Sequence, residues 1–219
     1  GRVDDRVGRA LDEAEEVAPE QDASRMKVAI VGAGAAGLAM AMRLVRSGHR
    51  DFTILERSAG VGGTWHDNRY PGAGCDIPSF LYSFSFAPNP GWSRKYARQP
   101  EILSYFERCA EVFGVTGHIE FGTTVTAADY DEAEGVWRIA TEGGEQRVAD
   151  ILVCAVGQLS RPRIPEIPGL DSVAGDRFHS ARGNPKADLT DREVAVIGNA
   201  ASAVQLVPRI AGQARRVRI

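Results

Sequence analysis

Short apolar runs alternate with segments of helical character at the beginning of the chain. Val28–Val31 is a continuous apolar run, as expected for a parallel strand that is covered on both faces. Ala35–Arg46 has a helical composition, and Gly48 suits its C-terminal cap. Residues 52–55 predict the next strand. Together they predict a strand, a helix and a second strand, the repeating unit of an α/β fold.

The pattern changes after position 57. Residues 57–98 are rich in Gly, Pro, Ser and aromatic residues and predict a long loop region, which inside a compact domain is usually functional. Residues 100–113 return to a helical pattern. Three short runs then predict an antiparallel meander, and residues 150–157 predict another buried strand. The runs of the meander are 127–130, Val136–Thr141 and Gln146–Ala149.

The end of the chain repeats the opening pattern. Residues 161–169 contain three prolines and predict an extended crossing segment. A buried strand at 193–197 leads through a glycine turn into a helix at Ala201–Ile210, and 217–219 begins another strand. We therefore predict an α/β protein with a Rossmann-like first domain of three layers, in which a parallel sheet is joined by an antiparallel β-meander. The beginning of a second Rossmann domain follows. The predicted divisions are a leader at 1–24, the first domain at 25–158, a linker at 159–192 and the truncated second domain at 193–219.

Composition narrows the class of protein. The 219 residues carry a formal net charge of −3, so no basic excess predicts binding to nucleic acid. Residues 1–24 hold eight acids and three arginines, and the spacing of Val3, Val7 and Leu11 predicts a short amphipathic helix there. The longest apolar stretch, 28–42, is too short and too interrupted by glycines to predict a membrane span.

The three cysteines bear on the compartment. Their odd number and the absence of a CxxC motif fit free thiols in a reducing cytoplasm, which is the predicted location because no signal peptide is visible. Cys154 lies in an apolar run and is expected to be a buried structural thiol. No metal site is predicted.

A glycine motif supplies the first candidate chemistry. Gly32, Gly34 and Gly37 form GxGxxG directly after a predicted strand and at the opening of a helix. The first glycine permits a tight turn, the second lets a pyrophosphate approach the backbone, and the third lets the helix pack on the strand. Glu56 ends the second strand, where an acid binds ribose hydroxyls. Because a carboxylate repels a 2′-phosphate, Glu56 favours FAD or NAD over NADP; a βαβ turn without ligand is the alternative.

The segment after this unit carries a resemblance to a known family. The pattern GGTW…RYPG…CD…YSFSF is matched at 62–65, 69–72, 75–76 and 82–86, and WSRKYARQPEI follows at 92–102. In these motifs the chain resembles the class B flavoprotein monooxygenases, particularly the Baeyer–Villiger monooxygenases of the 4-hydroxyacetophenone monooxygenase-like type. The resemblance runs from Met26 to Ile219 but covers less than half of a typical member. We therefore expect the remainder of the enzyme on a C-terminal portion or a second chain.

This resemblance implies an FAD-binding domain followed by the start of an NADPH-binding domain. It also implies an activity: oxygen from O₂ is inserted into a ketone through a C4a-peroxyflavin, with NADPH as reductant. Asp76 matches an acid that orients a catalytic arginine, which this sequence does not contain; a surface Asp that caps a turn is the alternative. Asp67 is expected to be a plain loop residue. The FAD contacts that the resemblance adds are Gly63, Thr64, Trp65, Asp76, Tyr82, Val125 (through its backbone) and Gly157.

Two later segments leave the activity open. Residues 171–185 resemble the Baeyer–Villiger fingerprint FxGxxxHxxxW, with Gly175 and His179 retained but Val173 and Gly183 in the aromatic positions. The degraded copy keeps N- and S-oxygenating flavin monooxygenases, which act on a soft heteroatom, as candidates. His179 is expected to have a structural or coupling role.

The second glycine loop is also altered. Only Gly198 remains of its three glycines, and Ala200 places a methyl group where a pyrophosphate would approach. Asn199 and Ser202 can donate to phosphate oxygens at the helix N-terminus, and Gln205 is grouped with them as an NADPH contact. A non-oxygenating FAD scaffold or a reductase-like flavoprotein is therefore the other interpretation.

Overall fold

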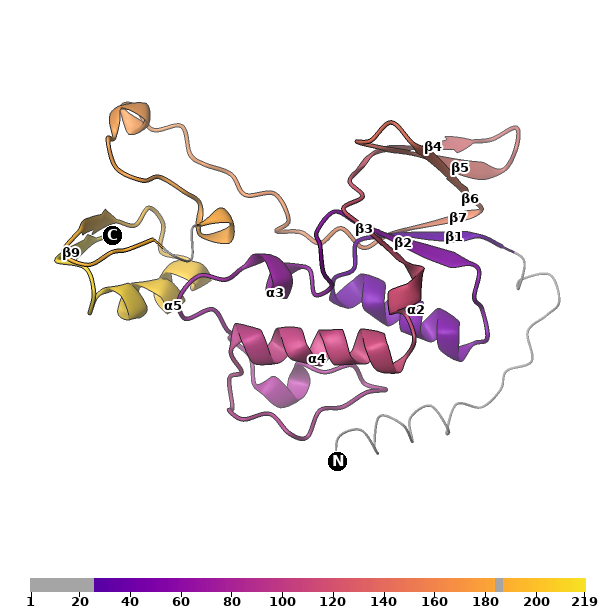
Figure 1. Ribbon diagram of the computed structural model, residues 1–219, viewed down its shortest axis with the longest axis horizontal. Coiled ribbons are helices and arrows are strands. Elements are labelled where there is room, and N and C mark those ends of the chain that lie inside the picture. The colour runs from indigo at the N-terminus through magenta and orange to yellow at the C-terminus, as the bar shows by residue number, and fades with distance from the viewer. Residues whose placement is uncertain (1–25, 184–186) are drawn as a thin grey trace.

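A parallel sheet forms the centre of the first unit. The computed structural model describes residues 26–183 and 187–219, so the predicted leader helix at 1–24 lies outside the described residues (Figure 1). Four parallel strands are arranged in the order β3-β2-β1-β7. They are β1 (Val28–Val31), β2 (Phe52–Glu56), β3 (Ile119–Phe121) and β7 (Ile151–Cys154).

Both faces of this sheet are covered, which gives the three layers that the sequence predicts. Helices α2 (Ala35–Arg46) and α4 (Gln99–Val112) lie on one face, and an antiparallel meander lies on the other (Figure 1). The larger core cluster, with the fully buried Ile30, Leu38 and Ile102, fills the helical side. A smaller one fills the side of the meander. The meander consists of β4 (Val125–Asp131), β5 (Val136–Thr141) and β6 (Gln146–Ala149).

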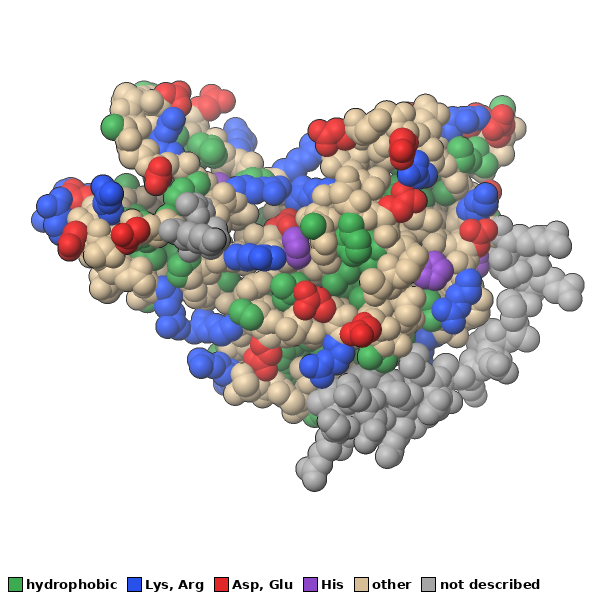
Figure 2. Space-filling view, viewed as in Figure 1, with side chains coloured by type: hydrophobic (Ala, Val, Ile, Leu, Met, Phe, Trp, Pro, Cys, Tyr) green, Lys and Arg blue, Asp and Glu red, His purple; other side chains and the backbone are tan. Residues whose placement is uncertain are grey.

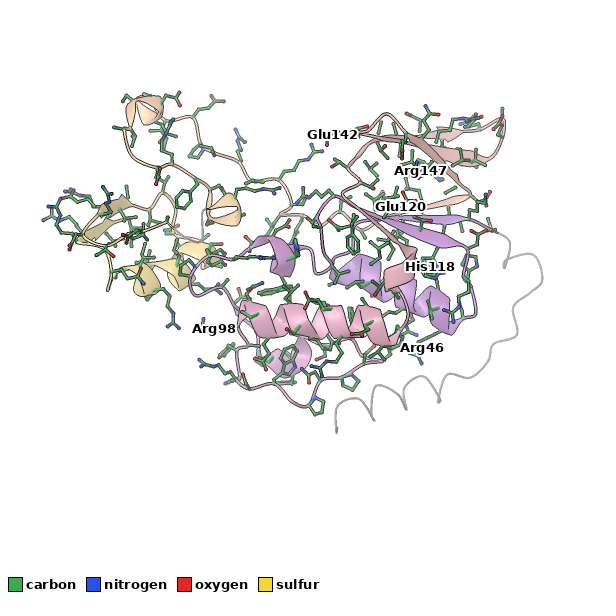
Figure 3. The ribbon with its side chains drawn as sticks, in the orientation of Figure 1. Arg46, Arg98, His118, Glu120, Glu142 and Arg147 are labelled. Carbon is green, nitrogen blue, oxygen red and sulfur yellow. The ribbon has the colours of Figure 1, made fainter. Side chains whose placement is uncertain are left out.

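Ion pairs tie the meander to the sheet and to itself. Arg147 of β6 donates to Glu120 of β3 at 2.8 Å (Figure 3). Arg138 of β5 donates to Asp131 of β4 at 3.0 Å. These pairs are partly exposed, so each contributes at most about 1 kcal/mol. Burial of Ile139 on the inner face fixes the register of the meander more strongly, because a shift by one residue would expose it.

The region 57–98 is a long loop, as predicted, and contains two short helical turns. These are α3 (Thr64–Asp67) and the 3₁₀ turn η2 (Ser79–Leu81). The loop is fastened to α4 by Tyr105, whose hydroxyl accepts from the amide of Phe84 at 2.7 Å and donates to the carbonyl of Ala87 at 2.8 Å. Another 3₁₀ turn, η3 (Thr116–His118), leads into β3.

A second unit follows the linker. It contains β8 (Glu193–Ala195), α5 (Ala201–Ile210) and β9 (Arg216–Arg218), with β8 and β9 paired in parallel. The linker carries the 3₁₀ turns η4 (Leu170–Ser172) and η5 (Ser180–Arg182). In Figure 1 the second unit lies at the end of the molecule opposite the meander.

Two expectations about burial are wrong. Strands β7 and β8, predicted to be buried, consist of half-buried and exposed residues, because β7 is the edge of its sheet and β8 pairs only with β9 among the described strands. Cys154, predicted to be a buried thiol, is exposed because it is the last residue of the edge strand β7.

Candidate dinucleotide-binding site

The glycine loop lies at the carboxyl end of β1, between the ends of β2 and β7. Gly32 has a φ of +103°, and a Cβ atom on it would lie 2.7 Å from the carbonyl oxygen of Ala155. A Cβ on Gly37 would lie 1.9 Å from the carbonyl oxygen of Gly32. Neither position accepts a side chain without a backbone shift, so the turn, α2 and the segment after β7 are packed backbone to backbone.

The second glycine segment meets the first at this place. The amide of Gly62 donates to the carbonyl of Ala33 at 2.9 Å, and a Cβ on Gly63 would lie 2.9 Å from the Cα of Gly34. Two segments that are far apart in the sequence therefore form one side-chain-free surface. Such a surface lets a diphosphate approach the backbone closely.

The beginning of α2 fits an anion at this surface. Gly34 is the N-cap residue of the helix; no side chain among the described residues caps it, and its first turn contains no acid. The first amides of a helix have no intrahelical acceptor, and the helix dipole adds partial positive charge there. These donors, beside Gly34 and Gly63, match what a pyrophosphate requires.

Glu56 lies against the same loop and is buried, with 5% exposure. Its Oε2 accepts from the amide of Ala33 at 2.6 Å, and its Oε1 accepts from the amide of Ser58 at 2.8 Å. Each carboxylate oxygen has a second acceptor site, so ribose hydroxyls can be bound while these bonds persist. The acid thus holds the glycine loop itself, a role that the sequence motif did not indicate.

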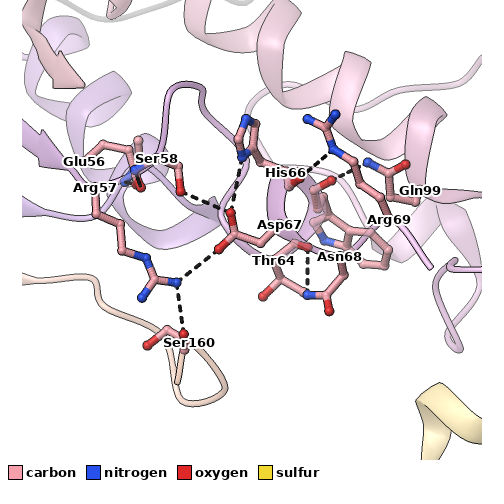
Figure 4. A network of polar contacts seen from close by, with 12 residues as sticks. Glu56, Arg57, Ser58, Thr64, His66, Asp67, Asn68, Arg69, Gln99 and Ser160 are labelled. Atoms are coloured by element: carbon pink, nitrogen blue, oxygen red, sulfur yellow. Dashed lines mark hydrogen bonds and ion pairs between the residues drawn. The ribbon is translucent and has the colours of Figure 1, made fainter. Parts of the chain in front are cut away.

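A polar network next to Glu56 corrects the expectation for Asp67 (Figure 4). Asp67 lies in α3 and accepts from Arg57 at 3.0 Å and from the Ser58 hydroxyl at 3.1 Å, and His66 Nδ1 lies 3.2 Å from it. Arg57 also donates to the carbonyl of Ser160 at 2.9 Å. Burial opposes ionisation of Asp67, but the hydrogen bonds from His66, Arg57 and Ser58 outweigh it, and the net effect lowers the pKa of Asp67. Asp67 is therefore the centre of a network that joins β2, α3 and the linker.

Trp65 of α3 and Tyr82 of the loop contact each other. Trp65 Nε1 donates to the Tyr82 hydroxyl at 2.6 Å, and the two rings meet edge to face with centroids 5.3 Å apart. The side chain of Gln99 donates to the carbonyl of Trp65 (Figure 4). Burial raises the pKa of the Tyr82 phenol, so this hydroxyl stays protonated near neutral pH. Thr64, the first residue of α3, is exposed.

The other residues that the sequence predicts to contact FAD lie on the segments next to Tyr82, Glu56 and β7. Asp76 is exposed on the loop that carries Tyr82, and its charge contributes to the raised Tyr82 pKa. Val125 is half-buried at the start of β4, two residues after an amide that donates to the carbonyl of Glu56. Gly157 is exposed beyond β7, with a φ of +69°.

The second glycine loop, at 198–203, belongs to the second unit and leads from β8 into α5. Gly198, with a φ of +109°, follows β8, and Ala200 is the N-cap residue of α5. Asn199 is exposed and Ser202 is half-buried in the first turn of the helix. The structure separates Gln205 from them, because both polar atoms of its carboxamide bond to the loop at 70–74.

His179, outside both loops, serves as the cap of a 3₁₀ turn. Its Nδ1 accepts from the amide of Ala181 at 3.1 Å at the start of η5. This bond is a structural one, in agreement with the structural role expected from the sequence.

Sequence comparison matches this architecture to known proteins. The sequence pattern of the pyridine nucleotide-disulphide oxidoreductase family matches residues 29–219. A Baeyer–Villiger monooxygenase of Streptomyces coelicolor is 48% identical over 191 residues, which are 87% of this chain and 37% of that protein. A Baeyer–Villiger monooxygenase of Pseudomonas aeruginosa is 44% identical, over 86% of this chain and 36% of that protein.

Solved structures agree. A steroid monooxygenase bound to NADP superposes with a TM-score of 0.79 at 43% identity, over 88% of this chain and 38% of that one. The OTEMO complex with FAD and NADP gives a TM-score of 0.82 at 36% identity, with the same coverage of both chains. The resemblance to Baeyer–Villiger monooxygenases that the motifs indicated is thereby confirmed. The chain spans less than two-fifths of the length of the curated relatives it matches.

Surface charge and the length of the helices complete the description. Acidic and basic side chains are interspersed over the face in view, which is notched between the linker and the meander (Figure 2). Within residues 26–183 and 187–219, no helix combines the length and the apolar character needed to cross a membrane.

Proposed function

This chain belongs to the pyridine nucleotide-disulphide oxidoreductase family, and we propose that it is the FAD-binding part of an NADPH- and O₂-dependent monooxygenase that inserts oxygen into ketones. One observation carries the proposal: four segments distant in sequence meet at the carboxyl ends of the strands. The buried Glu56, the glycine pair at 62–63 and the segment after β7 each contact the glycine loop there. In open α/β sheets this is the edge at which ligands bind.

Different residues of this edge would bind different parts of FAD. Gly34 and Gly63 would face the pyrophosphate of FAD, and Glu56 would accept from the ribose hydroxyls. Trp65 and Tyr82, fixed to each other, would orient the flavin end, with Thr64 as an exposed donor. Bound FAD would supply the hydride acceptance and the oxygen activation, while these side chains bind it and keep water away.

Further residue roles are proposed from the motif resemblance to the Baeyer–Villiger monooxygenases. The adenine would meet the backbone at Val125, and Gly157 would let the chain pass the cofactor. NADPH would lie at the beginning of α5, at Gly198, Asn199 and Ser202, where the first amides of a helix favour a phosphate. Asp76 would act near the flavin. We accordingly propose an FAD-binding domain at 25–158, a linker at 159–192 and the beginning of an NADPH-binding domain at 193–219.

The substrate and the partner are proposed in the same way. Relatives named Baeyer–Villiger monooxygenases favour a ketone as substrate, and they are much longer than this chain, so we propose a further polypeptide portion that carries the rest of the NADPH site and the substrate pocket. The cytoplasm is the proposed location, because all three thiols are free.

Dithiol chemistry, to which the name of the family refers, does not suit the cysteines of this chain. Cys75 and Cys109 are buried and Cys154 is exposed, and none of them forms a CxxC pair. Burial raises the pKa of the Cys109 thiol to about 11, whereas a redox-active thiol requires a lowered pKa.

A non-oxygenating flavoprotein is the second candidate. It is favoured by Ala200, which stands at the N-cap of α5 where a glycine would leave room for a phosphate. The altered fingerprint, with Val173 and Gly183, favours the same candidate or an N- or S-oxygenating enzyme.

Three measurements test the proposal: FAD binding, reduction of the bound flavin by NADPH, and identification of the oxygenated product. FAD is titrated into the purified chain and bound flavin is measured by fluorescence; failure to bind overturns the proposal. NADPH is next mixed anaerobically with the flavin-loaded protein, completed by its remaining polypeptide, and the loss of flavin absorbance is recorded. Reduction followed by an ester product from a ketone supports the proposal. A sulfoxide or amine oxide alone supports heteroatom oxygenation, and flavin that NADPH does not reduce supports the non-oxygenating candidate.

A further inference from the structure

Helix α5 of the second unit is fastened to the first unit by the side chain of Gln205. Its Oε1 accepts from the Tyr70 hydroxyl at 2.9 Å and from the Gly74 amide at 3.3 Å, and its Nε2 donates to the Gly74 carbonyl at 2.9 Å. We propose that Gln205 is a positioning residue that docks α5 on the loop at 70–74 and so sets the place of the second unit relative to the flavin-side unit. This inference goes beyond the proposed reaction and does not depend on it.

The loop at 70–74, called here the α5 seat, is itself firmly held. The amide of Ala73 donates to the carbonyl of Tyr70 at 3.1 Å, which closes a turn. Arg98, which precedes α4, donates to the carbonyl of Gly72 at 2.8 Å (Figure 3), and the amide of Gln99 donates to the carbonyl of Ala73 at 3.0 Å. Because the seat is anchored to α4, any group that docks on it is placed relative to the whole first unit.

Gly72 supplies a second, independent sign that the seat is shaped for the helix. It has a φ of +88°, and a Cβ on it would lie 2.5 Å from the backbone carbonyl oxygen of Gln205 and 2.8 Å from Cγ of Arg209. The second of these atoms belongs to a flexible side chain, but the first is helix backbone and cannot yield easily. The helix therefore lies directly on the glycine.

The contact requires a carboxamide at position 205. The same backbone residue, Gly74, offers both a donor and an acceptor, and the Gln205 side chain supplies an acceptor and a donor in return. A carboxylate would lack the donor, and a methionine of similar length would lack the donor and offer only a weak acceptor. The seat continues directly into Cys75 and Asp76, so the contact also links α5 to the loop that carries Asp76.

Hydrogen exchange measured on the full chain, with and without FAD, tests the proposal. We expect Q205A, Q205E and Q205M to speed exchange in two segments, 70–75 and 201–210, while that of α2 stays unchanged. For Q205A the expected acceleration is about tenfold, the effect of losing a net hydrogen bond or two of ordinary strength. FAD affinity is expected to be unchanged. Failure of the proposed function would appear as absent FAD binding, which leaves the exchange result readable.

A double-mutant cycle separates a direct contact from a general loss of helix stability. If the Tyr70 hydroxyl acts through Gln205, the effect of Y70F is expected to disappear in the Q205A background. Additive effects of Y70F and Q205A on exchange would overturn the proposal, as would unchanged exchange of both segments in Q205A.

Gly72 offers a further test with a matched control. G72A and G144A both place a side chain on a glycine with a φ near +80° to +90°, but the Cβ of G144A meets no atom within 4 Å. We expect only G72A to accelerate exchange in α5. Equal behaviour of the two variants in α5 would contradict direct packing of the helix on the seat.

Discussion

Glu56 at the end of β2 accepts a hydrogen bond at 2.6 Å from the amide of Ala33 in the turn that follows β1. Its other carboxylate oxygen accepts from the amide of Ser58, so one buried side chain joins the turns that follow two neighbouring strands. A residue expected to bind only ribose therefore also shapes the loop that would receive the pyrophosphate. We therefore expect the stability of the protein and its affinity for FAD to depend on the same carboxylate.

The variant E56Q tests this dual role. A glutamine keeps one acceptor oxygen but turns an NH₂ group toward one of two amide donors, which leaves a buried donor without an acceptor. We expect a loss of about 1–3 kcal/mol in the free energy of unfolding, together with weaker FAD binding. Urea denaturation and fluorescence titration measure the two effects. E101Q is the control, because Glu101 also accepts from an amide and a hydroxyl, those of Ser93, at an exposed place; equal effects of both variants would contradict the role of Glu56.

The close approach of Gly63 to Gly34 predicts that G63A disturbs the cofactor loop. A methyl group there would lie 2.9 Å from the Cα of Gly34, so the two segments must separate. G122A is the control: its φ of +66° is comparable to the +53° of Gly63, but no atom lies within 4 Å of its Cβ. Backbone strain is expected to cost G122A about 1 kcal/mol of stability. G63A is expected to lose more, because the contact with Gly34 adds to the strain. Only G63A is expected to weaken FAD binding, measured by titration, and an unchanged affinity would show that this surface does not contact the ligand.

The network of Asp67 predicts a stability that depends on pH. Its pKa is lowered below the ordinary value of 3.8 in the folded protein, so its stabilising effect is present above that value and is lost as the pH falls through the folded pKa. We expect D67N to cost about 1–3 kcal/mol at pH 7, because charged hydrogen bonds with Arg57 and His66 are removed or weakened. Below about pH 4 the difference from the wild type is expected to shrink.

Denaturation of both proteins between neutral and acidic pH measures this difference. D129N, a change at an exposed carboxylate of β4, is the control. A difference between wild type and D67N that stays constant down to the lowest pH would contradict a role for the Asp67 charge.

Local patterns predicted most of the fold. Helix α5 has the predicted bounds, and α2 does as well, because their apolar periodicity and flanking glycines are properties of neighbouring residues. Strand β3 was not predicted, since it has only three residues and is stabilised by pairing with β2 rather than by its own pattern. The exposure of β7 was not predictable in this way either, because a strand does not show in its sequence whether it lies at the edge of a sheet.

The candidate site likewise contains some residues that the sequence predicts and others that only the fold brings together. The glycine motif and Glu56 could be read from the sequence, because a turn and a strand end determine them. The network of Asp67 and the docking of Gln205 depend on partners brought together by the fold, 10 and up to 135 residues away. No rule of sequence spacing predicts such pairs, so only the structure shows them.

The different environments of the thiols give the last prediction. Cys154 is exposed at the end of β7, whereas Cys75 and Cys109 are buried and the pKa of Cys109 is raised to about 11. A thiolate fraction on the order of 10⁻³ at pH 8 makes Cys109 slow to react even where a reagent reaches it. We therefore expect iodoacetamide to modify one thiol of the native chain quickly, and the other two only after unfolding.

Mass spectrometry of the alkylated chain identifies the modified residue, and C154S supplies the control. This variant is expected to lose the fast phase and to keep its fold, because an exposed thiol contributes little to packing. Fast modification of Cys109 in the folded chain would contradict the burial of this α4 residue. If Cys154 stayed unreactive in the native chain and reacted only in denaturant, the end of β7 would have to be covered in solution, and the original expectation of a buried thiol would be restored.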